Sequence, residues 1–246
     1  MKRRIKHVTV LGSGIMGSGI AAHFANIGVE VLLLDIVPFE LTEAEQKKGL
    51  TKEDKAVRNR IATESLAKLV KASPALLYKK EFAERISVGN FDDDLQKIKN
   101  TDWIIEVVVE RLDIKKSVYE KIEQFRKPGT LVSSNTSGIP INMLVEGRSA
   151  DFKHYFAGTH FFNPVRYLPL LEIIPTKDTD AEIVKFYMEY GAKFLGKTTV
   201  LAKDTPAFIA NRIGVFSIMN LLHNVKSIGL NVTEVDKLTG PVIGRP

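Results

Sequence analysis

Cysteine is absent from the 246 residues, and tryptophan occurs only once. The absence of cysteine excludes disulfides, cysteine-ligated zinc, iron–sulfur clusters and thiol nucleophiles. It also suits a reducing compartment, so we expect a cytoplasmic protein without a resident metal. No apolar run approaches the ~20 residues that span a bilayer, so we expect no membrane span. Residues 1–6 are basic and run into a strand-like segment without a small-residue cleavage site, which is not typical of a secretory signal.

Charge of one sign is not concentrated in any segment. The chain carries 35 Lys+Arg and 29 Asp+Glu, interspersed, for a net charge of +6. There is no arginine-rich arm, zinc-finger spacing or aromatic RNA-binding signature, so we expect no nucleic-acid partner. The basic excess favours a small, phosphate-rich ligand instead.

The order of strand-like and helix-like segments predicts an α/β protein. His7–Leu11, Met16–Gly28 and Glu30–Ile36 form a complete β-α-β unit. The later segments alternate in the same way. Strands are expected at Arg85–Val88, Trp103–Val109, Thr130–Ser134 and Thr198–Leu201, and helices at Asp92–Lys99, Asp113–Phe125 and Asp180–Phe194.

Two strands break this alternation. Tyr155–Phe162 and Leu168–Ile174 are joined by only five residues, too few for a crossover helix, so the pair should be antiparallel. The fold class is therefore α/β, a Rossmann-type doubly wound, mostly parallel sheet with an antiparallel strand pair, followed by the beginning of an all-helical domain. We place this Rossmann-type domain at residues 1–203 and the start of the helical domain at 204–246.

The region from Pro38 to about Lys80 is predicted to be helical and strongly charged, with a break at Pro74. In the second domain, Asp204 or Thr205 is the expected N-cap, and Pro206 is the expected first helical residue.

The apolar residues of Ala207–Leu222 cover most of a helix surface and should be buried, but only one more helical pattern follows, near Thr233–Leu238. We therefore expect this chain to be an N-terminal piece of a longer protein. As an isolated piece it should self-associate and turn over poorly.

A glycine-rich motif, Gly12-Ser13-Gly14-Ile15-Met16-Gly17, follows the first strand and opens the first helix. This context indicates dinucleotide binding, with the pyrophosphate at the helix N-terminus. Asp35 ends the second strand at close to the ~20-residue spacing expected of a ribose-binding acid. Because its carboxylate would bind a ribose 2′-hydroxyl and repel a 2′-phosphate, we predict NAD rather than NADP. We assign Gly12, Gly14, Ile15, Met16, Gly17 and Asp35 to cofactor binding.

A histidine and a glutamate indicate acid–base chemistry. His160 sits at the end of one strand of the antiparallel pair, and Glu172 lies on the other. A carboxylate there can bind the imidazole Nδ1–H and stabilise the charged ring. His154 is six residues earlier and would share a face with His160 in one regular strand, so spacing does not choose between them. The pattern also fits a surface ion pair.

Four motifs occur in order along the chain, and together they closely resemble the L-3-hydroxyacyl-CoA dehydrogenase family of fatty-acid β-oxidation. They are the glycine motif at 12–17, Ser-Ser-Asn-Thr-Ser at 133–137, His-Phe-Phe-Asn-Pro-Val at 160–165 with Glu-Ile-Ile at 172–174, and Asp-Thr-Pro-Ala-Phe-Ile-Ala-Asn-Arg at 204–212. The resemblance spans nearly the whole chain. It implies oxidation of a (3S)-3-hydroxyacyl-CoA to a 3-ketoacyl-CoA with NAD.

The same resemblance assigns roles to further residues. His160 would be the general base, oriented by Glu172. Ser137 and Asn211 would hydrogen-bond substrate oxygens, and Asn163 would support the same pocket. Glu110 and Lys115, together with Ser137 and Asn163, match positions on the cofactor side. Ser65 and Lys68 are the candidates for binding coenzyme A.

The resemblance also implies partners: an acyl-CoA substrate, a second copy of the chain in a homo-oligomer, and a fused enoyl-CoA hydratase domain in a longer protein. Two features depart from the family pattern. Ala207 stands where many members have glycine, and the charged region from Glu40 to Lys80 is longer than in short members.

Two other functions remain open at this point. One is an NAD-dependent dehydrogenase of a free hydroxy acid or sugar acid, which would use the same His–Glu pair without coenzyme A. The other is a non-catalytic NAD-binding module, which would keep residues 12–17 and would not need His160 or Glu172.

Overall fold

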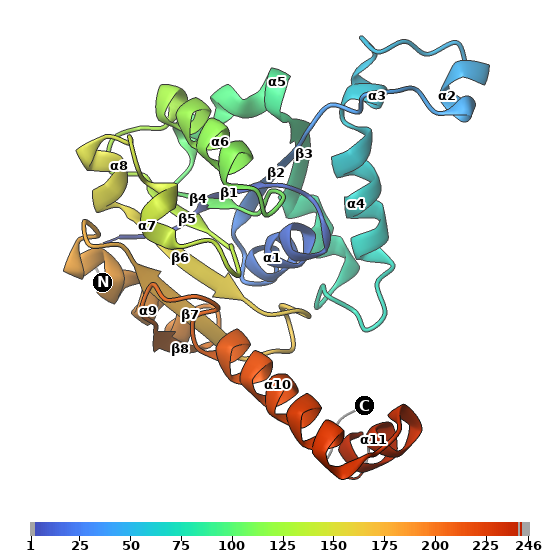
Figure 1. The fold of residues 1–246 in the computed structure, drawn as a ribbon. Helices are drawn as coiled ribbons and strands as arrows, with labels where there is room; N and C mark the ends of the chain where they lie inside the picture. The colour runs from blue at the N-terminus through green and yellow to red at the C-terminus, as the bar shows by residue number, and fades with distance from the viewer. Residues whose placement is uncertain (1–2, 241, 243–246) are drawn as a thin grey trace.

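The computed structural model describes residues 3–240 and 242. The extreme ends of both predicted domains, residues 1–2, 241 and 243–246, lie outside the described residues. Over the described part, eight strands form one sheet in the order β3-β2-β1-β4-β5-β6-β7-β8 (Figure 1). The strands are β1 (His7–Leu11), β2 (Glu30–Asp35), β3 (Ile86–Asn90), β4 (Trp103–Glu106), β5 (Leu131–Ser134), β6 (Phe156–Phe161), β7 (Leu170–Pro175) and β8 (Thr198–Leu201).

The pairing confirms the predicted Rossmann topology. Strands β3, β2, β1, β4, β5 and β6 are parallel to one another, and β6 and β7 are antiparallel. Strand β8 then runs parallel to β7. The order reverses between β1 and β4, the place where doubly wound sheets bind ligands at the carboxyl ends of their strands.

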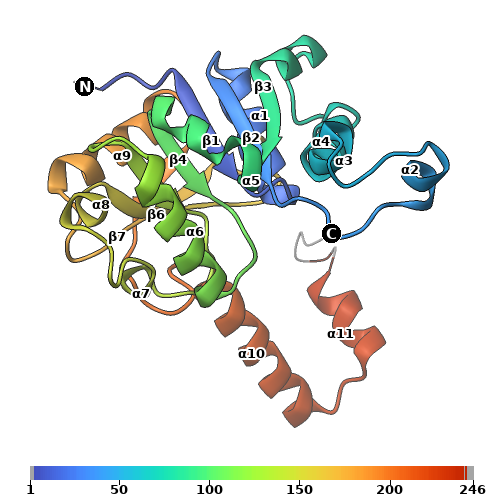
Figure 2. The same cartoon turned by 90° about the horizontal axis from the view of Figure 1, so that it is seen from above.

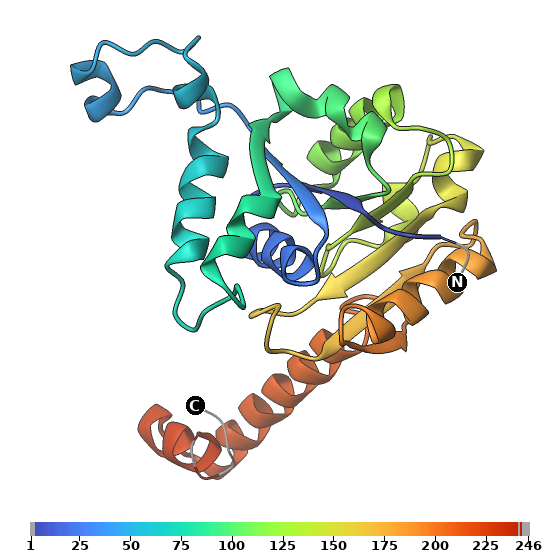
Figure 3. The same ribbon diagram turned by 180° about the vertical axis from the view of Figure 1, so that it is seen from behind.

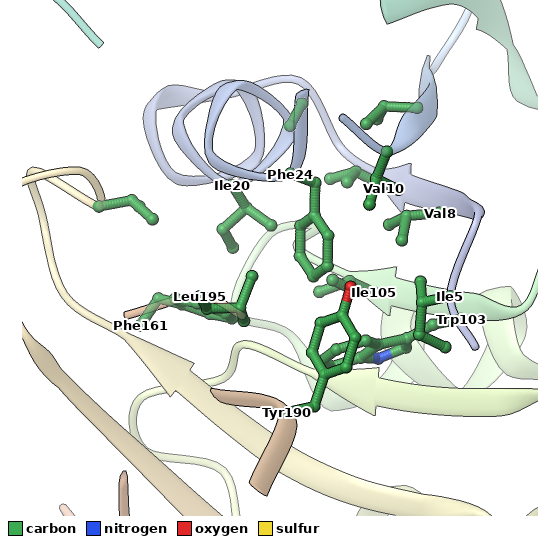
Figure 4. Close-up of a cluster of buried hydrophobic side chains, with 14 of the residues drawn as sticks. Ile5, Val8, Val10, Ile20, Phe24, Trp103, Ile105, Phe161, Tyr190 and Leu195 are labelled. Carbon is green, nitrogen blue, oxygen red and sulfur yellow. The ribbon is translucent and has the colours of Figure 1, made fainter. Parts of the chain in front are cut away.

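Helices cover both faces of the sheet, as the two apolar cores show. On one face α1 (Ile15–Asn26), α4 (Arg60–Val70) and α9 (Ala181–Lys193) enclose the core drawn in Figure 4, in which Phe24 packs edge-on against Trp103 with ring centroids 5.3 Å apart. On the other face α6 (Leu112–Phe125), α7 (Ile141–Leu144) and α8 (Ala150–His154) pack against the sheet.

The β1–α1 turn depends on glycine at two positions. Gly12 has φ +105°, which side-chain-bearing residues rarely adopt, and its N–H donates to the Leu34 carbonyl of β2. A Cβ on Gly17 would lie 1.8 Å from the Gly12 carbonyl oxygen, so only glycine lets α1 start this close to β1. At Gly14, by contrast, a Cβ would meet nothing within 4 Å.

The region from Pro38 to Lys80 is not one helical pattern. It contains α2 (Glu43–Lys47), α3 (Lys55–Arg58) and α4, and its first part projects from the body as an arm (Figure 2). Thr42 caps α2 through a capping box with Glu45, and Gly49, with φ +69°, follows the end of that helix. Helix α4 ends at Val70, so Pro74 lies in the following loop and breaks no helix.

Other boundaries also differ from the prediction. The segment Asp92–Lys99 splits into α5 (Phe91–Asp94), capped by Asn90, and a 3₁₀ helix at Leu95–Asn100. Strand β4 ends at Glu106 rather than Val109, because its partner β1 ends at Leu11, opposite Glu106. Helices α7 and α8 were not predicted; each is only four or five residues long.

The linker into the helical region was predicted wrongly. Helix α10 (Ala210–Ile228) begins at Ala210, and neither Asp204 nor Thr205 caps it. The Asp204 carboxylate instead accepts hydrogen bonds from the backbone N–H groups of Ile141 and Asn142, at 2.8 and 2.9 Å, at the start of α7. With the Asp204 carboxylate bound to α7, a turn at residues 206–209 separates Asp204 from the start of α10.

Helix α10 runs away from the sheet, and α11 (Val232–Thr239) follows it (Figures 1 and 3). Its apolar side chains are exposed, as expected where only one short helical pattern follows: Ile213, Phe216 and Met219 are 61%, 71% and 60% exposed. Among the described residues, no helix is both long and apolar enough to cross a bilayer.

The two glycines of the β1–α1 turn give a first testable difference. Gly17→Ala should lower the free energy of unfolding by about 1–3 kcal/mol or more, because its Cβ would overlap backbone. Gly14→Ala, with free space around the added methyl and φ −60°, should leave stability nearly unchanged. Urea denaturation of both variants measures this. Equal stability of the two would show that α1 can shift away from β1.

Candidate active site

A cavity of about 470 Å³ opens at the carboxyl edge of the sheet, where β1, β4, β5 and β6 end. It brings the glycine loop together with the predicted catalytic histidine. Its lining consists of Gly14, Ile15, Met16, Gly17, Val107, Val108, Asn135, Ser137, His160, Phe161, Phe162 and Asn163.

The glycine loop has the chemistry that a dinucleotide requires. Helix α1 starts at Ile15, directly on the cavity, and its N-cap Gly14 provides no capping side chain. The first N–H groups of the helix therefore point toward the cavity side of the loop, with the positive end of the helix dipole. These features suit a pyrophosphate, and the free space around Gly14 lets such a group approach the backbone.

Asp35 lies at the end of β2 beside this loop. Its Oδ2 accepts hydrogen bonds from the Ser13 N–H and the Ser13 hydroxyl, both at 2.6 Å, and its Oδ1 accepts from the Ile36 N–H at 2.7 Å. Three donors thus fix the carboxylate in place. Ser13 was not predicted as a site residue, although it stands within the glycine motif.

His160 and Glu172 form the pair that the sequence suggested. They are directly opposite in the β6–β7 register, and His160 Nδ1 lies 2.7 Å from Glu172 Oε2. Glu172 is fully buried and His160 is 4% exposed, so this is not a surface ion pair. With Nδ1 bound to Glu172, the ring nitrogen available to a substrate in the cavity is Nε2.

The second oxygen of Glu172 binds the start of α10. Glu172 Oε1 accepts from the backbone N–H groups of Ile209 and Ala210, at 3.1 and 2.8 Å. Two aromatic rings also flank His160: Phe162, with ring centroids 4.3 Å apart, and Phe208 at 5.6 Å. Neither aromatic residue was predicted, although both stand inside the motifs that include His160 and Asn211.

Ser137 and Asn211 lie side by side, since Asn211 Nδ2 is 3.5 Å from the Ser137 carbonyl oxygen. Glu110 holds the same loop by accepting from the Thr136 hydroxyl and from the N–H groups of Ser137 and Gly138. Burial opposes ionisation of Glu110, but these bonds and nearby Lys115 outweigh it and lower its pKa. Glu110 thus shapes the loop that lines the cavity.

Lys115 is buried rather than at the cavity surface. Its ammonium donates to Glu106 at 2.7 Å and lies 3.3 Å from Glu110. The other oxygen of Glu106 accepts from the Tyr119 and Ser134 hydroxyls, both at 2.6 Å. Glu106, which was not predicted, therefore ties β4, β5 and α6 together beneath the site.

Ser65 and Lys68, the candidates for coenzyme A, line a second cavity of about 320 Å³ between α1 and α4. Gly14 and Ile15 line both cavities, so the two adjoin at the glycine loop. The Ser13 hydroxyl also lies 3.1 Å from the Ser65 hydroxyl.

The structure separates His160 from the other histidines. His154 ends α8 instead of lying in β6, and its Nε2 is 2.9 Å from Asp180 on the surface. His23 is buried and bound to the Leu195 carbonyl; desolvation, aided by Lys197, lowers its pKa to about 4, as expected of a neutral core histidine. His7 pairs with Asp102 at the far end of β1, and His223 lies on α10.

Comparison with known proteins identifies the family. A profile described as "3-hydroxyacyl-CoA dehydrogenase, NAD binding domain" matches residues 7–205. The chain belongs to the 3-hydroxyacyl-CoA dehydrogenase family. Because the matched region is this family's NAD-binding domain, the cofactor is NAD, and the fold and loop described above fit it.

Three similar proteins illustrate the range of this family. A Bacillus subtilis protein named "Probable 3-hydroxyacyl-CoA dehydrogenase" is 54% identical over all of this chain and 31% of its own length. A Rickettsia felis protein, provisionally described as a fatty acid oxidation complex trifunctional enzyme, is 37% identical over the whole chain and 32% of its own length. The crystal structure of (S)-3-hydroxybutyryl-CoA dehydrogenase PaaH1 from Ralstonia eutropha matches with a TM-score of 0.72 and 28% identity, over 94% of this chain and 75% of that one.

The chain thus spans about a third of the length of the Bacillus and Rickettsia relatives. Membership in this NAD-dependent oxidoreductase family rests on the first 205 residues.

Asp35 gives a direct test of the cofactor site. Asp35→Ala should weaken NADH binding about tenfold to a hundredfold, since the lost hydrogen bonds involve a charged group. The preference over NADPH should narrow, because the 2′-phosphate is no longer repelled. Fluorescence titration with both nucleotides measures this, and Ser13→Ala, which keeps the carboxylate, should show a smaller loss. Unchanged affinities for both nucleotides in Asp35→Ala would mean that Asp35 does not face the ribose.

Proposed function

We propose that this protein oxidises (3S)-3-hydroxyacyl-CoA to 3-ketoacyl-CoA with NAD, with His160 as the general base. The observation that carries the proposal is the buried His160–Glu172 pair, which opens on the same cavity as the glycine loop. Binding of NAD alone does not require a fully buried carboxylate bound to a histidine that lines the cavity, so this pair favours an enzyme over a non-catalytic NAD-binding module.

In this reaction His160 accepts a proton from the substrate and Glu172 orients His160. His160 Nε2 takes the proton of the substrate 3-hydroxyl as the C3–H bond breaks. The glycine loop at residues 12–17 and Asp35 would hold NAD, which would supply the acceptor for the hydride of C3. Glu172 Oε2, 2.7 Å from Nδ1, holds the ring and balances the positive charge that His160 gains. Phe162 and Phe208 cover the ring and keep water from it.

Substrate oxygens would be bound by Ser137, which lines the cavity, and by Asn211, whose Nδ2 lies 3.5 Å from the Ser137 carbonyl oxygen. Asn163 lines the same cavity and supports this pocket. Coenzyme A would reach the second cavity, where the Lys68 ammonium suits a phosphate and Ser65 offers a hydroxyl. Glu110 and, through it, Lys115 hold the Ser137 loop on the cofactor side.

The longer relatives suggest the setting of this activity. The name of the Rickettsia protein refers to fatty acid oxidation and to three functions in one chain. We propose the same setting here: β-oxidation in the cytoplasm, by a homo-oligomer whose chain continues into an enoyl-CoA hydratase domain. The exposed apolar side chains of α10, among them Phe216 and Met219, are where a second copy or further helices would pack.

The role of His160 predicts a selective loss of chemistry. His160→Gln should reduce turnover ~10²–10⁴-fold, the usual effect of losing a general base. NADH affinity should stay at the wild-type value, because the glycine loop and Asp35 do not depend on the imidazole. Steady-state kinetics and NADH titration measure the two effects. His154→Gln is the matched control and should keep wild-type turnover; the opposite result for the pair would make His154 the base.

The substrate is tested by a series of compounds. NADH formation should occur with (3S)-3-hydroxyacyl thioesters of coenzyme A, which place the 3-hydroxyl at His160 and coenzyme A at Lys68. It should not occur with the (3R) enantiomer, whose hydroxyl points away from His160, or with free 3-hydroxybutyrate, which lacks coenzyme A. Turnover of the free acid but not of the thioesters would support a hydroxy-acid or sugar-acid dehydrogenase instead. If NADH binds but no compound turns over, the chain is an NAD-binding module.

A further inference from the structure

Between β8 and α10 the backbone makes a left-handed turn at two residues that are not glycine. Ala207 has φ +63° and Phe208 has φ +49°. Residues with a side chain rarely adopt this conformation, and it persists only where surrounding contacts hold it. Two such residues in succession therefore point to contacts that fix both ends of the turn.

Those contacts are present on both sides. Before the turn, Asp204 is bound to α7 through the backbone N–H groups of Ile141 and Asn142 and the Asn142 side-chain amide, at 2.8, 2.9 and 2.6 Å. After the turn, the N–H groups of Ile209 and Ala210 donate to Glu172 Oε1.

Within the turn itself, Phe208 is 3% exposed, and its ring packs on His160. The turn thus places the N–H groups of Ile209 and Ala210 on Glu172 and the Phe208 ring against His160.

The geometry of Glu172 makes these donors important. The carboxylate is fully buried, with one oxygen on His160 and the other on the start of α10. A buried carboxylate that loses its donors rotates toward whatever donors or water remain. Rotation of Glu172 would move Oε2 away from His160 Nδ1 and leave the imidazole without its orienting partner.

We propose that Ala207 and Phe208 are positioning residues for the reaction: their left-handed turn seats the first N–H groups of α10 on Glu172, and through Glu172 it sets the orientation of His160. A shift of α10 relative to the sheet would therefore change the orientation of the His160 ring. The role in catalysis rests on the proposed function of His160, whereas the coupling of the turn to the His160–Glu172 hydrogen bond does not.

The test is the proton resonance of His160 Nδ1–H in protein labelled with ¹⁵N-histidine. A hydrogen bond to a buried carboxylate moves such a proton far downfield, and His160→Gln identifies the signal by its loss. In Ala207→Val the β-branched side chain disfavours the left-handed conformation, so the resonance should shift upfield or disappear in the folded protein. Ala207→Gly, which adopts this conformation freely, should retain the signal.

Gly49→Val is the matched control. Gly49 also has a positive φ, +69°, and a Cβ there would meet nothing within 4 Å, but it lies in the arm that follows β2. This variant should lower the melting temperature and leave the His160 resonance in place. An unshifted resonance in Ala207→Val, or equal loss in Gly49→Val, would overturn the proposal.

A second variant covers the case in which Ala207→Val does not fold. Ala207→Leu has an unbranched Cβ and a smaller penalty, so its resonance should shift by an intermediate amount. In the dehydrogenase assay the same variant should lower kcat and leave KM for NAD unchanged. A lowered kcat with an unshifted resonance would count against the coupling, and a shifted resonance with unchanged kcat would count against His160 as the base.

Discussion

The buried carboxylate of Glu172 is the interaction on which the rest of the site depends. A charge taken fully out of water must find partners on each side, or the fold loses several kcal/mol. Here the partners come from two elements that are far apart in sequence: His160 on β6 and the start of α10. The antiparallel pairing of β6 with β7 puts Glu172 directly opposite His160. The hydrogen bonds of this one carboxylate therefore connect the sheet, His160 and the start of the helical region.

A second buried carboxylate has the same role beneath the cofactor side. Glu106, at the end of β4, binds Lys115 and Tyr119 of α6 and Ser134 of β5. Above it, Glu110 holds the loop that carries Ser137. The two sides of the cavity are thus each built on a buried carboxylate, Glu172 within β7 and Glu106 at the end of β4. This explains why loops at the carboxyl edge of the sheet can hold site residues in fixed positions.

Much of this was predictable because it is encoded locally. The glycine motif, Asp35 and the β-α-β unit lie within about thirty residues, and the five-residue connection between β6 and β7 forces their antiparallel pairing. The pairing of His160 with Glu172 followed from that hairpin. The turn at Ala207 and Phe208 was missed because Asp204 binds α7, a contact between segments some sixty residues apart. A helix of four residues such as α7 leaves too little periodicity to detect.

Glu106 was missed for a different reason. It is the one charged residue in the apolar run Trp103–Val109, and the run as a whole predicts a strand without assigning a role to Glu106. A lone carboxylate in a buried strand must have partners, so it was the available signal for the network beneath the site. Spacing alone did not choose between His154 and His160, and the family resemblance favoured His160. The structure adds the physical reason, because the five-residue helix α8 ends at His154 and takes it out of the strand.

The most direct test is a crystal structure of the protein with NAD and a 3-ketoacyl-CoA, an unreactive complex in which neither the oxidised cofactor nor the keto thioester has a hydride to transfer. The account predicts that the C3 oxygen lies within hydrogen-bond distance of His160 Nε2, with Glu172 still on Nδ1 and coenzyme A beside Lys68. A C3 oxygen bound away from His160, with the imidazole facing only protein, would contradict it.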